Sequence, residues 1–302
     1  MKRLVGFLSI ALALTGCLCS NDEPGIYNVG DWEAFTEAVN TGAPLTAWED
    51  GAGVVRLRND LNLKRWKNPR PAGADSSTPF QGVFDGGNHT ISGLKLTSDN
   101  AYVGLFGINR GTIRRLKLHG KCRIESTNAE GVVGALCGEN YGRVEHCENE
   151  AEVRGAGCVG GLVGHMQSDP ATTTITLIAR CKNLGAVIST GACAGGIVGR
   201  NSNAKVVDSD NVGPIIGKGD YVGGIVGLNG GSIRNCENLA PIQGRAYAGG
   251  IAGANKGNGT FNEVSNQAPI RAETIGEIVG EDRTNQLVDE DTLQELYHRE
   301  AE

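Results

Sequence analysis

One copy of a repeated element reads Gly223-Gly224-Ile225-Val226-Gly227, and Asn229, Gly231, Ile233, Cys236, Asn238 and Ile242 follow it. Its closing glycine recurs at Gly107, Gly138, Gly164, Gly199, Gly227, Gly253 and Gly280. The earlier segment Gly82-Val83-Phe84-Asp85 fits the same pattern, with Asp85 in the place of that glycine. Repeats of roughly 20–50 residues indicate solenoids or other stacked arrays. The polar segment 168–174 lies in the widest spacing and is expected to form a loop between turns.

Three columns of residues keep their register from copy to copy. The first is Ile91, Ile113, Val144, Ile178, Val206, Ile233 and Phe261. The second, three residues later, is Leu94, Leu116, Cys147, Cys181, Ser209, Cys236 and Val264. The third changes from Leu96 and Leu118 to Asn149, Asn183, Asn211, Asn238 and Asn266. Such columns predict parallel strands stacked about 4.8 Å apart, with the asparagine amides bonded up and down a ladder.

The composition agrees with an all-β solenoid of thin-walled turns. Aromatic residues make up 5% of the chain and 46 residues are glycine, so a core of large side chains is not expected. Short runs of Val, Ile, Leu and Thr are broken by Gly and Asn, which favours strands. Segments such as 113–118 and 144–149 also resemble the strands of leucine-rich repeats. Glycine-rich remainders with further β-branched pairs favour a parallel β-helix with several strands per turn over such a horseshoe.

The segments Gly161-Leu162-Val163-Gly164, Gly196-Ile197-Val198-Gly199 and Gly224-Ile225-Val226-Gly227 resemble the GLUG motif of bacterial surface proteins. Residues 80–94 are similar to the opening turn of the same proteins, and the resemblance covers roughly residues 26–288. It implies a single-stranded, right-handed parallel β-helix of the pectate-lyase-like kind, found in adhesin-like proteins and in non-catalytic parts of immunoglobulin-A-cleaving metallopeptidases. Because the motif describes a scaffold, it is a weak guide to function.

Short helices are expected to cap both ends of the solenoid, since exposed strand edges would recruit other chains. Residues 31–40 have Trp32, Phe35, Ala38 and Val39 at helical spacing, with Asp31 as the cap at the start and Gly42 at the end. Residues 291–298 could form a second short helix. The segment 66–79 is polar, contains proline and is interpreted as a surface loop.

The first residues resemble a bacterial lipoprotein signal, because Lys2 and Arg3 precede a short apolar run that ends at Cys17. The resemblance implies cleavage before Cys17 and lipidation of that cysteine with fatty acyl chains such as palmitate. The predicted organisation is a signal peptide (1–16), a lipidated tether (17–25), an N-terminal cap (26–79), β-helix repeats (80–288) and a C-terminal tail (289–302). The acidic tether resembles one that directs lipoproteins of Bacteroidetes type to the outer face of the outer membrane.

Charge restricts the possible partners. Loss of Lys2 and Arg3 would change the net charge of −6 to −8, so nucleic acid and anionic lipid surfaces are not expected as partners. The expected partners are the lipid bilayer, through acylated Cys17, and host or microbial glycans or glycoproteins.

The histidines and cysteines do not indicate a cofactor or a catalytic metal. No two of the five histidines have metal-ligand spacing, and the zinc-peptidase pattern is missing. Seven cysteines lie in the repeats without a C-x-x-C pair, so zinc is not expected. Most are expected to be buried apolar residues, although stacking would also permit disulfides between Cys147 and Cys181 or between Cys158 and Cys193.

Acidic and aromatic residues leave two functions open. Asp208, Asp210 and Asp220, with Asn235 and Glu237 one turn later, could form the acidic patch of a polysaccharide lyase or hydrolase. Asp85, near His89, is interpreted as turn chemistry. Tyr221 and Tyr247 share a column and, with Tyr102 and Tyr141, could stack on sugars or simply pack at the rim. We expect a non-catalytic binding or adhesion scaffold rather than an enzyme, with a carbohydrate-active β-helix enzyme as the alternative.

Overall fold

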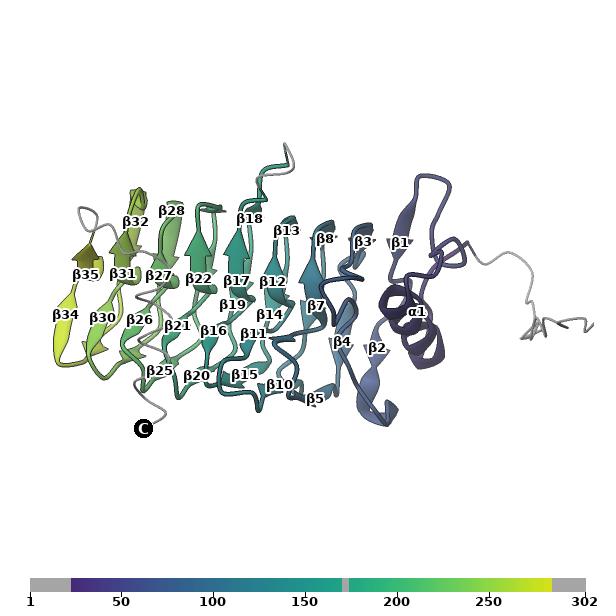
Figure 1. The fold of residues 1–302 in the computed structure, drawn as a ribbon, viewed down its shortest axis with the longest axis horizontal. Coiled ribbons are helices and arrows are strands. Elements are labelled where there is room, and N and C mark those ends of the chain that lie inside the picture. Colours follow the sequence, from purple (N-terminus) through teal and green to yellow (C-terminus); the bar gives the residue numbers. More distant parts are fainter. Residues whose placement is uncertain (1–22, 170–173, 284–302) are drawn as a thin grey trace, which may run out of the picture.

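The computed structural model describes residues 23–169 and 174–283, which form a parallel β-solenoid of about eight turns with one N-terminal helix, α1 (Val29–Thr41). The turns follow one another along a single axis, and α1 covers one end of the rod (Figure 1). The predicted all-β solenoid is therefore confirmed. The predicted C-terminal helix at 291–298 lies outside the described residues.

Sheet 1 has fourteen strands. The strands form two flanks that meet at a corner. Its first flank contains β1 (Val54–Arg56), β3 (Val83–Asp85), β8 (Thr112–Arg114), β13 (Arg143–Glu145), β18 (Leu177–Ala179), β23 (Lys205–Val207), β28 (Ser232–Asn238) and β32 (Thr260–Asn266). Its second flank contains β2 (Leu61–Asn62), β4 (Thr90–Ser92), β9 (Lys117–Leu118), β14 (Glu148–Asn149), β19 (Lys182–Asn183) and β24 (Asp210–Asn211), and it ends on β28. A 3₁₀ turn, η1 (Leu63–Arg65), follows β2.

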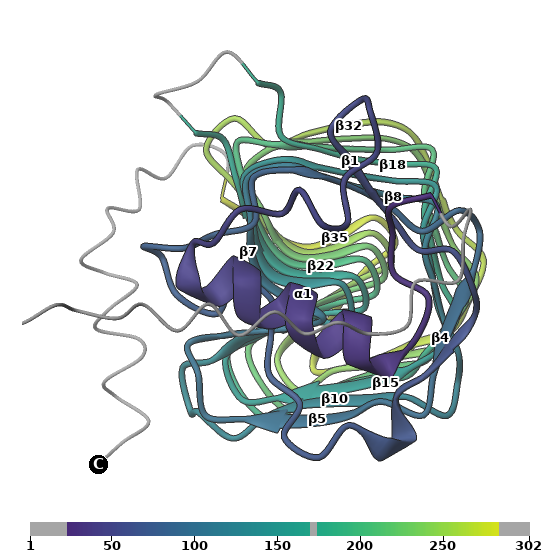
Figure 2. The ribbon, with the colours of Figure 1, turned by 90° about the vertical axis from the view of Figure 1, so that its right-hand side faces the viewer.

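The other walls are three sheets of seven strands each. Sheet 2 contains β5 (Lys95–Ser98), β10 (Arg123–Ser126), β15 (Glu152–Gly155), β20 (Val187–Ser189), β25 (Ile215–Gly217), β29 (Ile242–Gln243) and β33 (Ile270–Arg271). Sheet 3 contains β6 (Tyr102–Val103), β11 (Val132–Gly134), β16 (Cys158–Gly160), β21 (Cys193–Gly195), β26 (Tyr221–Gly223), β30 (Tyr247–Gly249) and β34 (Thr274–Gly276). Sheet 4 contains β7 (Phe106–Asn109), β12 (Cys137–Asn140), β17 (Val163–Gln167), β22 (Val198–Ser202), β27 (Val226–Asn229), β31 (Ala252–Lys256) and β35 (Val279–Arg283). Viewed from the α1 end, the chain runs clockwise from β4 through β5 and β7 to β8 as it recedes, which is a right-handed coil (Figure 2).

The first predicted column is confirmed from Ile113 onward, but its first member is wrong. Phe84, not Ile91, pairs with Ile113, and Ile91 pairs with Leu118. Leu96 likewise pairs with Ile124 in sheet 2. The turn at residues 86–88 adds length to the first copy. Ile91, Leu94 and Leu96 therefore have the same spacing as one set of residues in each later copy, but Ile91 and Leu96 pair with other positions.

The closing-glycine column is confirmed from Gly107 onward, but Asp85 is not part of it. Asp85 pairs with Arg56 and Arg114 in sheet 1. The residue beside Gly107 is Gly73, whose carbonyl accepts the N–H of Ile108 (2.9 Å). The segment 66–79 is thus not only a surface loop, because Ala72 is fully buried and bridged to β7.

The corner of sheet 1 is made by one residue per turn in the left-handed backbone region. These residues are Asn88, Arg115, His146, Arg180, Asp208, Asn235 and Glu263, with φ between 49° and 65°. This conformation costs roughly 1–2 kcal/mol for a residue with a side chain, less for Asn and Asp. Burial of the stacked columns offsets this cost, because the kink turns both flanks inward and keeps the columns on each side of it in the core.

Buried asparagines form the predicted ladder. Asn149, Asn183, Asn211, Asn238 and Asn266 are joined by Nδ2–H···Oδ1 bonds of 2.9, 2.8, 2.9 and 2.7 Å. Each of the first four also donates to a backbone carbonyl two residues later. A second set that we did not predict joins Asn201, Asn229 and Asn255 in sheet 4. Where they are present, the ladders satisfy buried backbone groups at two corners of a turn.

The paired glycines let the chain fold inward between sheets 3 and 4 (Figure 2). A Cβ atom on Gly224 would lie 2.0 Å from the Gly250 carbonyl oxygen and 2.5 Å from Cγ of Asn238. The bend therefore packs directly against the asparagine ladder of sheet 1. The outer faces of sheets 3 and 4 are brought together by this inward fold.

Helix α1 is longer than predicted and has a different cap. Asn28 is the N-cap and its side chain accepts the N–H of Asp31 at 3.2 Å, whereas Asp31 lies in the first turn. Gly42 ends the helix with φ 67°, as predicted. The apolar face, which includes Trp32 and Phe35, is buried over the first turns. A cluster of aromatic rings closes this end of the rod.

Candidate functional site

The outer faces of sheets 3 and 4 carry two facing columns that contain tyrosines and titratable side chains. In sheet 3, parallel register places Tyr102, Val132, Cys158, Cys193, Tyr221, Tyr247 and Thr274 in one column. In sheet 4, the facing column is Ile108, Glu139, His165, Arg200, Leu228, Ala254 and Glu281. We call these two columns together the sheet 3/4 face.

Tyr221 and Tyr247 stack as the sequence predicted, with ring centroids 6.0 Å apart and an interplanar angle of 21°. The two rings are not equally accessible. Tyr221 is only 7% exposed, and it packs with the Cys158–Cys193 pair, Leu228 and Ala254. Burial raises the pKa of its hydroxyl. Tyr247 is half-buried, so it is the ring of the pair that can meet a ligand.

Glu139 lies at the centre of a second group on the same face. Its carboxylate is 3.2 Å from Nδ1 of His165, and Nε2 of His165 is 3.1 Å from Oγ of Ser202. With a proton on Nδ1, the imidazole donates to Glu139 and accepts from the Ser202 hydroxyl. Burial, and then the charge of Glu139, raise the pKa of Tyr102 and raise the pKa of Tyr141 to about 12. Tyr102 and Tyr141 therefore belong to this group and not to the stacked pair.

An acid, an imidazole and a hydroxyl in this order also occur in hydrolytic triads. Such a triad needs donors for the developing oxyanion. Beside Ser202, however, the N–H of Ser168 donates to the Ser202 carbonyl (3.2 Å), and the N–H of Gly230 donates to the Asn201 carbonyl (2.8 Å). Both N–H groups are already engaged in hydrogen bonds between stacked turns. The Glu139–His165–Ser202 contacts tie together side chains of three successive turns on the sheet 3/4 face.

Sequence reasoning missed this group because it treated the histidines only as metal ligands. The signal was present, since Glu139 and His165 hold the same position in successive repeats. The contact with Ser202 is diagonal, from one turn to a position two residues further along the next, so column matching alone does not reveal it.

The predicted acidic patch forms in part on the outside of sheet 1. A cavity of about 360 Å³ is lined by Asp208, Asp210, Asn235, Cys236, Glu237, Glu263 and Ser265. Asp220 is elsewhere and makes an ion pair of 2.6 Å with Arg245. Burial, and then the neighbouring Glu237, raise the pKa of Asp210. Within residues 23–169 and 174–283, no group of His, Cys, Asp or Glu has an arrangement that could hold a metal ion.

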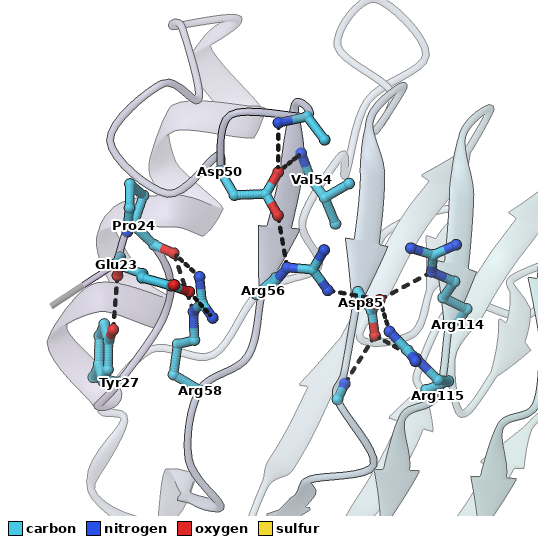
Figure 3. A network of polar contacts seen from close by, with 12 residues as sticks. Glu23, Pro24, Tyr27, Asp50, Val54, Arg56, Arg58, Asp85, Arg114 and Arg115 are labelled. Atoms are coloured by element: carbon cyan, nitrogen blue, oxygen red, sulfur yellow. Dashed lines mark hydrogen bonds and ion pairs between the residues drawn. The ribbon is translucent and has the colours of Figure 1, made fainter.

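Asp85 is the centre of an arginine cluster that joins the first three turns (Figure 3). Its fully buried carboxylate accepts from Arg56 (3.2 Å), Arg114 (3.0 Å) and Arg115 (2.9 Å). It also accepts the N–H of Gly87, which confirms the predicted turn chemistry. Burial opposes ionisation of Asp85, but the Arg115 hydrogen bond and the other donors outweigh it and lower the pKa.

The same cluster continues toward the cap and leaves His89 outside it. Asp50 bonds to Nε of Arg56 at 2.6 Å, and Arg58 binds Glu23 and the Pro24 carbonyl (Figure 3). His89 lies 3.3 Å from Asp60 instead of contacting Asp85. These contacts fasten the first turns together.

The structure decides between a disulfide and free thiols for each of the two cysteine pairs that the sequence left open. Cys158 and Cys193 form a disulfide, with Cα atoms 4.8 Å apart. Cys147 and Cys181 are free and buried, as are Cys122, Cys137 and Cys236. Burial raises the pKa of the Cys236 thiol to about 12. The free cysteines of the described chain are thus buried packing residues.

The predicted lipidation site, Cys17, lies outside the described residues. Within the part of the chain that the structure describes, no helix is long and apolar enough to cross a bilayer.

Comparisons with known proteins agree with the fold. No family model matches the chain. A protein of Evansella cellulosilytica named "Putative Gly-rich membrane protein" is 32% identical over 102 residues, which cover 32% of this chain and 12% of that relative. The crystal structure of a "putative immunoglobulin A1 protease" from Bacteroides ovatus superimposes with a TM-score of 0.64 over 91% of this chain and 87% of that one. At 17% identity, this likeness shows a shared β-solenoid fold.

Proposed function

We propose that this chain is a non-catalytic scaffold for binding or adhesion, displayed at the cell surface and held in the outer membrane through acylated Cys17. The observation that carries the binding role is the stacked tyrosine pair with one half-buried ring, Tyr247. A rigid aromatic ring on a regular wall suits the apolar face of a sugar, and its partner ring fixes its orientation. Host or microbial glycans and glycoproteins are the proposed ligands.

Replacing Tyr247 by Ala is expected to lower affinity for a retained glycan by roughly tenfold, because an aromatic contact contributes about 0.5–1.5 kcal/mol beyond its buried area. The mature chain would be tested against immobilised host glycoproteins and a polysaccharide panel, with retention and released product measured together. Tyr247→Phe keeps the ring and should retain binding.

The same assay separates a scaffold from an enzyme. Release of product at catalytic turnover, abolished by Ser202→Ala, would contradict the non-catalytic proposal and favour a hydrolase built on Glu139, His165 and Ser202. Retention that is equal for wild type and Tyr247→Ala would contradict the role of the tyrosine pair.

Membrane attachment has a separate test. Replacing Cys17 by Ser should move the protein from the outer-membrane fraction to a soluble one and remove its acyl chains, because two or three chains are needed for firm anchoring. Cys19→Ser, two residues away, is the matched control and should leave fractionation and acyl mass unchanged. Acyl chains still present on the Cys17→Ser protein would refute this anchor.

A further inference from the structure

A cavity of about 630 Å³ opens at the corner between sheets 1 and 2 near the α1 end of the rod. It is lined by Asn62, Leu63, Lys64, Trp66, Ser92, Gly93, Lys95, His119 and Lys121. Its volume lies within the range of small-ligand sites, roughly 300–1,000 Å³. We call it the lysine pocket.

The backbone of three successive turns builds this pocket. Asn62 pairs with Ser92, and His119 follows β9, which pairs with β4. Gly93 has φ 70°, and a Cβ atom there would lie 2.6 Å from Oδ1 of Asn62. The glycine therefore allows the η1 segment to fold close over β4, so that lysines from three turns meet at one corner.

The charges in the lysine pocket are unbalanced. Lys64, Lys95 and Lys121 are exposed, no aspartate or glutamate lines the cavity, and none of the three lysines makes an ion pair within residues 23–169 and 174–283. The neighbouring Arg123 shows the contrast, because it lies near both Glu125 and Glu152. Three uncompensated cations in a chain of net charge −6 create a local attraction for an anion.

Trp66 supplies an aromatic wall to the same cavity. Its ring is half-buried and packs edge-on against Trp32, with centroids 6.4 Å apart and an interplanar angle of 81°. Its backbone N–H donates to the Leu63 carbonyl at 3.0 Å. The ring is thus held in place on one side and reaches the pocket on the other.

A second cavity beside Trp66 is more nearly balanced in charge. It is lined by both acids and bases, and there Arg70 is paired with Glu37. The excess of positive charge is therefore larger in the lysine pocket, where no carboxylate opposes the three lysines.

We propose that the lysine pocket binds a saccharide that bears a carboxylate or sulfate group. Trp66 would stack on the apolar face of the sugar ring, the three lysines would bind the anionic group, and Asn62, Ser92 and His119 would bond to hydroxyls. A long nucleic acid does not fit, because its phosphates would meet the acidic remainder of the chain. This site is distinct from the tyrosine pair and does not depend on it.

The test is calorimetric titration of the full mature chain with a sulfated heparin octasaccharide, a carboxylated oligogalacturonate and a neutral galacto-oligosaccharide. We expect at least one acidic saccharide to bind and the neutral one not to bind. Binding by the sulfated arm alone, the carboxylated arm alone, or both would identify the anionic group. Absence of binding in both acidic arms, or equal binding of the neutral saccharide, would overturn the proposal.

A triple variant, Lys64→Gln, Lys95→Gln and Lys121→Gln, should weaken binding of the acidic saccharide by on the order of tenfold or more, because charge-assisted contacts are lost. Its matched control is Lys117→Gln, Lys182→Gln and Lys205→Gln, which removes the same charge from exposed positions elsewhere on sheet 1. The control should bind like wild type. Equal affinity of the pocket variant and wild type would refute the site, whereas loss of binding to glycoproteins through Tyr247→Ala alone would leave this proposal unaffected.

Trp66→Leu is a second variant that probes the stacking wall. It should weaken binding of the acidic saccharide while thermal unfolding shows that the solenoid persists. An affinity equal to that of wild type would exclude Trp66 from the site, and the lysines would then be a charged surface without a sugar platform, which would overturn the saccharide assignment.

Discussion

Replacing Asn183 by Asp is expected to lower the free energy of unfolding by about 4 kcal/mol or more at pH 7, because a buried carboxyl can have a pKa raised by some 3–5 units. Asn183 is fully buried and donates from Nδ2 to Gly185 O (2.9 Å) and to Asn211 Oδ1 (2.8 Å). An ionised carboxylate cannot donate to either acceptor, so its oxygens would face other oxygens. The unfolding midpoint in denaturant measures the loss.

The pH dependence of this variant gives a second readout. The introduced carboxyl would have a folded-state pKa above its unfolded value near 3.9, so the unfolded state releases the proton first. Relative to wild type, the variant should lose about 1.4 kcal/mol of stability for each pH unit above roughly 4, until the folded-state pKa is reached. Asn262→Asp, at an exposed position on β32, is the control and should show no such slope. A variant as stable as wild type at pH 7 would refute the ladder's role.

Replacing Gly224 by Ala is expected to destabilise the solenoid by about 3 kcal/mol or more, because the new methyl group would overlap backbone atoms that cannot move aside. It would lie 2.0 Å from the Gly250 carbonyl oxygen and against the Asn238 side chain. Removing a glycine also stiffens the unfolded chain, but that gain is only about 0.4–1 kcal/mol. The net effect is therefore destabilising, and the shift of the thermal unfolding midpoint measures it.

Gly51→Ala is the matched control for this prediction. A Cβ atom on Gly51 would meet nothing within 4 Å, and its φ is not in the left-handed range. This variant should unfold at or slightly above the wild-type temperature. If Gly224→Ala were equally harmless, the inward fold would not require a glycine at its bend.

The sequence predicted the parts of the solenoid in which similar side chains repeat. It did not predict the parts that depend on backbone conformation. Stacking of Ile113, Val144 and Ile233 follows from their periodic spacing alone, and so does the asparagine ladder. The corner of sheet 1 could not be foreseen, because Arg115, Arg180 and Glu263 have no intrinsic preference for the left-handed region. Those residues adopt it only because the stacked flanks on both sides are buried.

The candidate sites were predictable to different degrees. The Tyr221–Tyr247 stack follows directly from their shared column. The lysine pocket does not, because Lys64, Lys95 and Lys121 hold different positions in their turns and meet only through the 3₁₀ turn and the bend at Gly93. The extra length at residues 86–88 also displaces the first turn from the register of the later repeats, and the first turn is part of the region that builds the pocket.

Since each turn contacts mainly the turn before it and the turn after it, the rod has a fixed pitch. Four steps of sheet 2 register separate β5, which carries Lys95, from β25, which precedes Tyr221. At about 4.8 Å per step, this sets an axial distance of roughly 20 Å between the two turns that carry these side chains. Duplication or deletion of one repeat would lengthen or shorten that distance by the rise of one turn, about 4.8 Å. The spacing between the two sites can therefore change in evolution while the contacts between neighbouring turns stay the same.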